Sequence, residues 1–403
     1  MKGCSHIMSG RLARRAARSA GFGTRLAALA GALALGTALA ACGSSSSSTT
    51  PTKSNSDVST GVKYAQQLVT AGLKQPTAPV PSAAISNIAA LKGKTVYYIP
   101  VSADVPAFAI TAAAMKAALA TVGVKLSVCS GNFTPSGFSS CFAQAIGAHA
   151  GAIVSDAVPF QITQGLITEA SKKQIPVIVT DVNIVSPRPT ASNITYISGS
   201  NQQYALSQDW IIADSGGKAN VLELEATDSP TSAAGTAEYA IPALKAHCPG
   251  CTVTTLKFSS SNEQLLPSEI SALLLKHPNI NYIYSEFDQY VPGVLQGVQQ
   301  ASATSKVKIV AAAAALSGLQ DVKSGTPVKA EIADNQVYNG WIDADEALRL
   351  MAGQAAITYT IPIRLFTSTN IGSVTLSNGA QASGEWFGAF GYQQQFEHLW
   401  GVH

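Results

Sequence analysis

The sequence of 403 residues predicts an α/β protein with two doubly wound parallel-sheet lobes. From Lys94 onward, short apolar runs that favour β-strands alternate with longer segments of helical periodicity. The runs are apolar almost throughout, as expected for strands that are covered on both faces of a parallel sheet. Two such strand–helix series follow one another, which predicts two lobes of similar construction.

The first strand–helix unit contains a candidate ligand site. Residues 95–101 are predicted to form a strand and residues 107–122 a helix. In sheets of this kind, ligands bind beyond the carboxyl ends of the strands. Ser102, Asp104 and Phe108 directly follow the strand, so we expect them to contact a ligand.

The same periodicities predict the other elements of the two series. The first series continues with strands 124–128, 151–155, 175–180 and 194–198 and helices 136–147 and 160–173. A helix at 202–213 leads to the second series, with strands 220–225, 252–257, 281–285, 307–312 and 328–332. Its helices are expected at 232–246, 265–276, 289–302 and 316–323, followed by a late helix at 338–351.

The segments that flank the two series have different patterns. Residues 58–73 have a weak helical pattern, and Pro76, Pro79 and Pro81 predict an extended connection after it. Residues 359–366 and 373–376 alternate like strands. The aromatic-rich end of the chain, within 377–403, is expected to pack back on a lobe.

The N-terminus has the features of a targeting segment and is left out of the fold prediction. Residues 1–41 contain six Lys or Arg residues and no acid, and the apolar run 26–39 is short for a membrane span. Leu39-Ala40-Ala41-Cys42 resembles the lipobox of bacterial lipoproteins, which implies lipidation of Cys42. The Ser/Thr-rich stretch 43–57 is expected to be a flexible tether.

The charge of the remaining chain argues against nucleic-acid binding. Without residues 1–41 the chain has 20 basic and 23 acidic residues, a net charge of −3. Proteins that bind nucleic acids derive much of their affinity from basic side chains that neutralise phosphates. We therefore expect no nucleic-acid partner.

Four cysteines remain after the targeting segment and Cys42 are set aside. In an oxidising exterior, an even number favours disulfides, and we expect Cys129–Cys141 and Cys248–Cys251. Cys248-Pro249-Gly250-Cys251 resembles a redox dithiol, but it lies in a predicted loop from a helix into a strand. A redox site would place the first cysteine at a helix N-terminus. A structural bridge is the favoured interpretation.

No motif for an enzyme, cofactor or metal site was found. After the targeting segment, no nucleophile elbow, phosphate-binding loop or dinucleotide-binding glycine motif follows a predicted strand. The histidines are scattered, so a zinc site with four convergent ligands is not expected. The sequence predicts a protein that is not an enzyme and has no cofactor.

Several segments resemble the type I periplasmic binding proteins, close to the ribose-binding group. They are IPVIVTD (175–181), ITYISGSN (194–201), NINYIYSEFD (279–288) and VKSGTPVKAEIADN (322–335). The resemblance covers residues 94–353 and implies a substrate-binding component of an ATP-driven importer. It also implies three crossover hinge segments between the lobes, near 199–201, at 334–335 and after Gly353.

The hinges divide the body of the chain into two lobes, and the flanking segments bring the number of expected parts to five. We expect a lipoprotein signal peptide (1–41), then a tether and N-terminal extension (42–92). A first lobe of 93–199 plus 335–353 and a second lobe of 200–334 plus 354–376 follow. Residues 377–403 form the C-terminal tail.

The resemblance also implies ligand contacts at particular positions. Phe108 corresponds to an aromatic residue that stacks on a sugar, Asp181 to an acid that accepts sugar hydroxyls, and Asn201 to an asparagine near a hinge. Asp288 matches the Asp of an Asn-Asp pair in which Phe287 replaces the Asn, and Asp334 stands where the family often has Gln.

Three positions depart from the family pattern, and the departures leave the ligand open. Val182 and Ala234 replace expected arginines, and Ala311 to Ala315 replace a Gly-Phe-Asp-Gly turn. The scaffold therefore carries over, whereas ribose as the ligand does not.

The distribution of acids and arginines favours a neutral polar ligand. Asp156, Asp181, Asp228, Asp288 and Asp334 all lie at or just past predicted strand ends, where carboxylates can accept hydrogen bonds from hydroxyls. Beyond the targeting segment the arginines are Arg188, Arg349 and Arg364, and only Arg188 is expected near a ligand site. Recognition of an acidic ligand usually relies on arginine or a helix N-terminus, so such a ligand is disfavoured.

The sequence thus predicts a monomeric, lipid-anchored protein on the extracytoplasmic face of the cell membrane. Its expected partners are a neutral sugar or polyol and the permease of an ABC importer. One alternative is a ligand-sensing subunit for a membrane receptor kinase. Another is a secreted carbohydrate-active enzyme that uses Asp181 and Asp288 as paired carboxylates.

Overall fold

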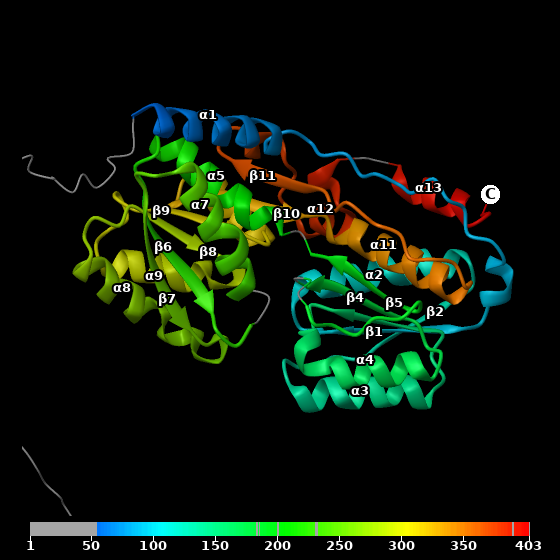
Figure 1. Ribbon diagram of the computed structural model, residues 1–403. Coiled ribbons are helices and arrows are strands. Elements are labelled where there is room, and N and C mark those ends of the chain that lie inside the picture. Colours follow the sequence, from blue (N-terminus) through cyan, green and yellow to red (C-terminus); the bar gives the residue numbers. More distant parts are fainter. Residues whose placement is uncertain are drawn as a thin grey trace, which may run out of the picture. The chain divides into compact units, whose positions relative to one another are not determined.

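The computed structural model describes residues 55–402 except 183, 185, 200, 230–232 and 389–390. The targeting segment and Cys42 lie outside the described residues. Two sheets form the described part of the chain, and helices cover both faces of each, as Figure 1 shows. The predicted fold class, two doubly wound α/β lobes, is confirmed.

The first sheet is entirely parallel, with the strand order β2-β1-β3-β4-β5. Its strands are β1 (Thr95–Pro100), β2 (Lys125–Val128), β3 (Ala152–Asp156), β4 (Val177–Val182) and β5 (Ile194–Ser198). Every residue of β3 is buried, which explains why Ala152, Ile153 and Val154 are apolar on both faces.

Alternate residues of these strands enter two different cores. On one face, Tyr98, Val154 and Ile178 pack with α2 (Pro106–Thr121) and α11 (Gln336–Met351). On the other face, Ile99, Ile153 and Val179 pack with α3 (Pro135–Gly147) and α4 (Phe160–Lys172). Figure 1 shows the same two layers of helices around the sheet.

The second sheet repeats this strand order and adds one antiparallel strand at its edge. Its order is β11-β10-β9-β8-β6-β7, and only β11 (Ile363–Thr367) runs antiparallel to its neighbour, β10 (Val328–Asp334). The others are β6 (Asn220–Ala226), β7 (Thr252–Phe258), β8 (Tyr282–Ser285) and β9 (Lys308–Ala312).

The remaining helices pack around the second sheet or belong to the end of the chain. They are α1 (Asn55–Gly72), α5 (Gln202–Ser215), α7 (Ile241–His247), α8 (Leu266–Lys276), α9 (Val291–Gln300), α10 (Leu316–Ser324), α12 (Asn378–Ser383) and α13 (Tyr392–Leu399). α8 and α9 cover one face of the second sheet, while α1 and α5 pack on the other.

Between β1 and β11 the chain passes from one lobe to the other three times. It leaves the first sheet after β5 and enters α5, returns from β10 into α11, and crosses again from α11 to β11. These crossings lie at the positions that the resemblance implied. Because α11 packs on the first sheet although its preceding strand belongs to the second, it connects the two lobes.

Two strand predictions near the C-terminus need correction. Residues 359–362 are not part of a strand, and pairing with β10 begins only at Ile363. Residues 373–376 are also not a strand. Val374 is buried and Leu376 packs against the same core, so their alternation reflects burial of an irregular segment.

The end of the chain packs on both lobes through its aromatic residues. Trp386 and Phe387 belong to the core around α8 and α9. Phe396 and Trp400 belong to the core around α2 and α11, where Trp400 stacks on Trp341 with ring centroids 5.5 Å apart.

Both predicted disulfides are present. Cys129–Cys141 joins the end of β2 to α3, and Cys248–Cys251 closes the turn between α7 and β7.

Candidate functional site

Two of the predicted site residues, Asp156 and Asp181, lie at the carboxyl end of the first sheet. Asp156 is the last residue of β3, is 3% exposed, and pairs in register with Thr180 of β4. Asp181 follows Thr180 at an irregularity in the β4–β5 pairing, and its φ of 53° lies in the left-handed region. The two acids therefore lie on neighbouring strand ends.

Only one oxygen of the Asp156 carboxyl group has a hydrogen-bond partner among the described residues. The Tyr98 hydroxyl donates a hydrogen bond of 2.5 Å to Asp156 Oδ2. In the described part of the chain, Asp156 Oδ1 is buried and has no hydrogen-bond partner. A buried polar atom without a partner is costly and calls for an explanation, such as a bound ligand.

Asp334 joins these acids from the crossing between the lobes. It ends β10 and is 6% exposed, and its carboxylate accepts hydrogen bonds from Asn339 Nδ2 (2.6 Å) and Gln336 Nε2 (3.0 Å). The Thr111 hydroxyl of α2 donates to Gln336 Oε1 over 2.8 Å. The Asp334 carboxylate is thereby held near the start of α11.

The start of α11 is fixed by a local cap. Asn335 Oδ1 accepts hydrogen bonds from the backbone N–H groups of Val337 and Tyr338, each 3.1 Å long. Side chains of this type at the N-cap satisfy donors that the helix itself leaves free. The cap places the start of the helix directly after Asp334.

A fourth acid, Asp343, projects from α11 toward the same strand ends. It is 1% exposed. Burial raises its pKa, the nearby Thr180 hydroxyl opposes the rise, and the charges of Asp181 and Glu346 add to it. Asp343 thus faces the sheet at the level where β3 and β4 end.

The four acids influence one another electrostatically. Burial raises the pKa of Asp156, as do the charges of Asp343 and Asp334, while the hydrogen bond from Tyr98 acts in the opposite direction. Burial also raises the pKa of Asp181, with contributions from Asp156 and Asp334. We call Asp156, Asp181, Asp334 and Asp343 the carboxylate cluster.

Groups of the second lobe border the carboxylate cluster. Burial raises the pKa of Tyr204 on α5, and the charges of Glu286, Asp181 and Asp334 raise it further. Glu286, which follows β8, accepts a hydrogen bond of 2.7 Å from the backbone N–H of Ala226. Tyr204 is therefore close to acids from both lobes.

Gly199 is required beside Asp181. A Cβ atom at this position would lie 2.5 Å from Asp181 Oδ1. The absence of a side chain at Gly199 therefore lets the Asp181 carboxylate occupy its place at the β5–α5 crossing.

Ser102, Asp104 and Phe108, which were predicted to contact ligand after the first strand, differ in their exposure to solvent. Ser102 is 1% exposed, and its hydroxyl accepts a hydrogen bond from the backbone N–H of Asp104. The Asp104 side chain is exposed. Phe108 is half-buried against the core shared by α2 and α11.

Asn201 and Asp228, two predicted residues of the second lobe, have protein partners. Asn201 Nδ2 donates to Ser198 Oγ and to the hydroxyl of Tyr239. Asp228 is exposed and accepts hydrogen bonds from Ser259 and Ser260.

The side chains of Asp288 and its neighbour Phe287 point into the interior of the second lobe. Asp288 is 4% exposed, accepts a hydrogen bond from Ser317 Oγ at the start of α10, and also interacts with buried Glu331. Phe287 packs against the core around α8 and α9.

Arg188 lines a groove of about 560 Å³ outside the carboxylate cluster. Its guanidinium lies 5.0 Å from the centre of the Tyr196 ring. The groove is formed by one side of α4 and the loop after β4, with the lining residues Gln164, Gly165, Thr168, Glu169, Lys172, Pro187, Arg188 and Pro189.

Sequence reasoning did not identify Tyr98, Tyr204, Glu286 or Asp343. Asp343 lies inside a helix whose sequence also contains Asp345, Glu346 and Arg349, as a solvent-exposed helix would. All of these residues are buried. Only the packing of α11 against the sheet distinguishes Asp343 from a surface acid.

The chain matches one family model over residues 96–355, described as periplasmic binding protein domain. No curated protein shows significant similarity to the chain. Among the helices that the structure describes, none has the length and hydrophobicity of a membrane span.

Several solved structures share the fold at low sequence identity. An ABC sugar transporter subunit from Rhodobacter sphaeroides is 20% identical, with a TM-score of 0.61, and the match covers 70% of this chain and 100% of the other. A solute binding protein from Agrobacterium vitis with bound allitol is 19% identical, with a TM-score of 0.61 and coverage of 70% and 98%. One from Bacillus halodurans with bound myo-inositol is 14% identical, with a TM-score of 0.62 and coverage of 70% and 97%.

Proposed function

Because this chain belongs to the periplasmic binding protein domain family, we propose that it is an extracytoplasmic solute-binding protein that captures a sugar or polyol between its lobes. One observation carries the proposal. The carboxylate cluster collects acceptors from β3, β4, β10 and α11 where the chain crosses between the lobes. Carboxylates in this arrangement can accept several hydrogen bonds from the hydroxyls of one small ligand.

The proposal extends to the delivery of the ligand. The solute binding proteins with allitol and myo-inositol are described as parts of ABC transporters, which supports an ABC importer as the partner. The lipobox-like segment ending at Cys42 supports a lipid anchor on the outer face of the membrane. In this role the protein binds ligand near the membrane and passes it to the permease.

A thermal-shift screen of the purified protein against sugars and polyols tests the binding proposal. Ligand that binds only the folded state raises the melting temperature, and the rise grows with the logarithm of the ligand concentration above the Kd. We expect at least one sugar or polyol to raise it. A flat response across both classes, with the folded protein verified by circular dichroism, would contradict the proposal.

The anchor is tested separately in cells by Cys42→Ala. The variant should either remain an unprocessed precursor or be released from the membrane. Normal processing together with unchanged membrane retention would show that Cys42 is not the anchor.

A further inference from the structure

Burial and mutual repulsion raise the pKa values of Asp156, Asp181 and Asp343, so a ligand with a positive charge would relieve the repulsion within the carboxylate cluster. Four acids meet at one place, and each of Asp156, Asp181 and Asp343 is affected by the charge of another member. Hydroxyl groups both donate and accept hydrogen bonds, whereas ionised carboxylates only accept them. A ligand that matches this site must therefore offer mainly donors.

Buried acceptor atoms remain unsatisfied at the same place. Asp156 Oδ1 belongs to a residue that is 3% exposed, and it has no hydrogen-bond partner in the described part of the chain. Asn339 Oδ1 is in the same state, while the other end of that amide is held by Asp334. Burying an acceptor without a donor costs about 1–3 kcal/mol, so a donor from the ligand would be strongly favoured.

The three arginines that follow the targeting segment have partners outside the carboxylate cluster. Arg349 forms a 2.7 Å ion pair with Asp345, Arg364 donates to the backbone carbonyl of Trp386, and Arg188 lies over Tyr196. The pKa values of Asp156 and Asp181 are shifted by burial, by other acids and by the Tyr98 hydroxyl, and no basic side chain contributes. Among the residues that the structure describes, no basic side chain is therefore found to offset the charge of Asp156 or Asp181.

A metal ion is not the natural counter-charge. Among the residues that the structure describes, no three His, Cys, Asp or Glu side chains are grouped so that they could hold a metal ion. The acids instead line the ends of several elements. A ligand with several polar groups can contact acids from more than one of these elements.

We propose that the ligand is a sugar or polyol that carries a protonated amine, and that its ammonium group binds the carboxylate cluster at Asp181 and Asp156. The proposal rests on the proposed function and specifies its ligand class. An ammonium group brings three donors and no acceptor, together with the missing positive charge. Asp181 is the member of the cluster that is only partly buried, so it is the first contact for an entering amine.

Isothermal titration calorimetry with matched ligand pairs tests the charge of the ligand. D-Glucamine is compared with D-glucitol, and D-glucosamine with D-glucose and N-acetyl-D-glucosamine, so that the members differ mainly in the ammonium group. A charge-assisted hydrogen bond contributes about 1.5–3 kcal/mol, so we expect the amine of at least one pair to bind at least about tenfold more tightly.

Two variants assign the preference to the cluster. Asp181→Asn keeps the shape and removes the charge, and it should reduce the amine preference to about threefold or less with little change in melting temperature without ligand. Glu169→Gln, an exposed acid of the same lobe on α4, is the matched control and should keep the full preference.

The possible results separate this inference from the proposed function. Equal or tighter binding of the neutral members would overturn the amine proposal and leave sugar or polyol binding intact. An amine preference that survives in Asp181→Asn would also overturn it. If no member of any pair binds, the amine proposal is contradicted, whereas the proposed function is contradicted only when the thermal-shift screen of sugars and polyols is flat as well.

Discussion

Asp181 and Asp288 were both expected to bind ligand, but the structure gives them different surroundings. Asp181 is partly exposed and belongs to the carboxylate cluster. Asp288 is buried, and its carboxyl group is turned toward Ser317 and Glu331. A Cβ atom on Gly318 would lie 2.1 Å from Asp288 Oδ1, so α10 closes over this carboxyl group.

We therefore expect opposite effects of alanine at the two positions. Asp181→Ala should weaken ligand binding by roughly tenfold to a hundredfold, as a lost hydrogen bond to a charged group predicts, with little change in stability. Asp288→Ala leaves the Ser317 hydroxyl without its acceptor inside the lobe and should lower the free energy of unfolding by about 1–3 kcal/mol. Titration calorimetry and urea unfolding of both variants measure the two effects. If Asp181→Ala and Asp288→Ala lost similar affinity and Asp288→Ala lost no stability, Asp288 would be a ligand contact and not a structural residue.

Gly199 offers a way to disturb Asp181 without changing it. Gly199→Ala places a Cβ atom 2.5 Å from Asp181 Oδ1, so the carboxylate must move. We expect at least about a tenfold loss of affinity, comparable to removal of one charged hydrogen bond. Gly165→Ala is the control, because a Cβ atom there meets nothing within 4 Å. Parent-like affinity of Gly199→Ala would mean that the position of Asp181 is not critical.

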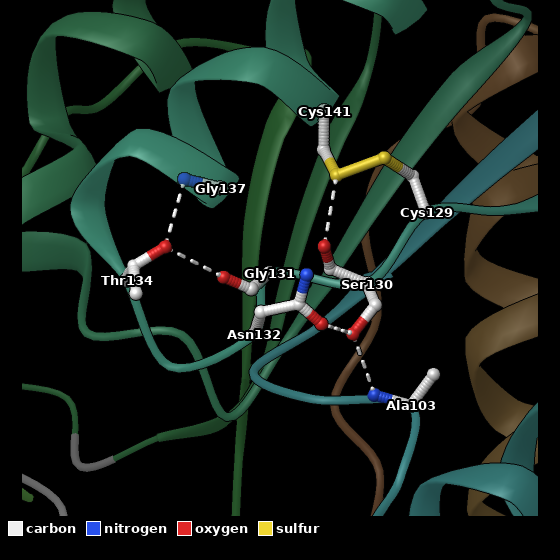
Figure 2. The surroundings of a disulfide bond; sticks show 8 residues. All are labelled: Ala103, Cys129, Ser130, Gly131, Asn132, Thr134, Gly137 and Cys141. Atoms are coloured by element: carbon white, nitrogen blue, oxygen red, sulfur yellow. Dashed lines mark hydrogen bonds between the residues drawn. A yellow bond between two sulfur atoms is a disulfide. The ribbon is translucent and has the colours of Figure 1, made fainter.

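At the scale of elements, the loop after β2 is the most constrained connection near the first strand end. Figure 2 shows the Cys129–Cys141 disulfide at the start of this loop and, within the loop, the Ser130 hydroxyl, which accepts a hydrogen bond from the backbone N–H of Ala103. Asn132 and Phe133 have φ values of 50° and 56°, which few non-glycine residues adopt. Phe133 is 60% exposed, so packing does not impose this conformation. The disulfide and the hydrogen bonds hold the loop in place.

Removal of this disulfide should destabilise the protein measurably. Cys129→Ser combined with Cys141→Ser opens a loop of 12 residues, and the chain-entropy model predicts a loss of up to about 3 kcal/mol. Cys248→Ser combined with Cys251→Ser is the comparison, because it opens a loop of only three residues and should cost less. Urea unfolding measures both. Equal stability of parent and first variant would show that the other contacts suffice.

Elements could be predicted from the sequence where burial and pairing coincide. Every strand of the first sheet was located, and β1 and β4 stand out most clearly because they are largely covered on both faces and mostly apolar. The prediction was wrong for 373–376, since Val374 and Leu376 are packed without pairing to a strand. Segment 232–246 was expected to be one α-helix, but residues Gly235–Ala240 form π-helical turns before α7.

The candidate site could be predicted only in part. Asp156, Asp181 and Asp334 were identified because they end strands, which is a property of the chain itself. Asp343 and Tyr204 join them through packing of α11 and α5, and such contacts are not encoded in a local pattern. The neutral-ligand expectation followed from the scarcity of arginine, which excludes anions but cannot distinguish a neutral ligand from a cation.

At the scale of the whole molecule, buried acids are distributed over both lobes. Burial raises the pKa of Asp209 to about 7. Burial and the charge of Glu286 raise that of Glu223 to about 8, against a hydrogen bond with Gln208. Burial likewise raises the pKa of Glu331, as does nearby Asp288. At a pH between about 4 and these raised pKa values, these carboxyl groups are therefore protonated in the folded protein. In the unfolded chain, where carboxyl pKa values are about 4, they are ionised.

The free energy of unfolding should consequently fall as pH rises. Between pH of about 4 and the raised pKa values, the folded state binds more protons than the unfolded state, and each such group contributes a slope of up to about −1.4 kcal/mol per pH unit. Urea unfolding at pH 5, 6, 7 and 8 checks the sign. Glu223→Gln removes one of these groups and should flatten the decline between pH 6 and 8. Stability that rises over this range would contradict the assignment of these buried acids.

The central claim is that the two lobes close over a small ligand about the crossings at Gly199, Asp334 and the segment after α11. Small-angle X-ray scattering of the purified protein, with and without the tightest-binding sugar, polyol or amino sugar of the titrations, tests it most directly. Closure about hinges brings the lobes together, so the radius of gyration should decrease at saturating ligand. Asp181→Ala at a concentration that saturates only the parent should keep the profile of the free protein. A profile that does not change when calorimetry proves the parent saturated would contradict capture by closure.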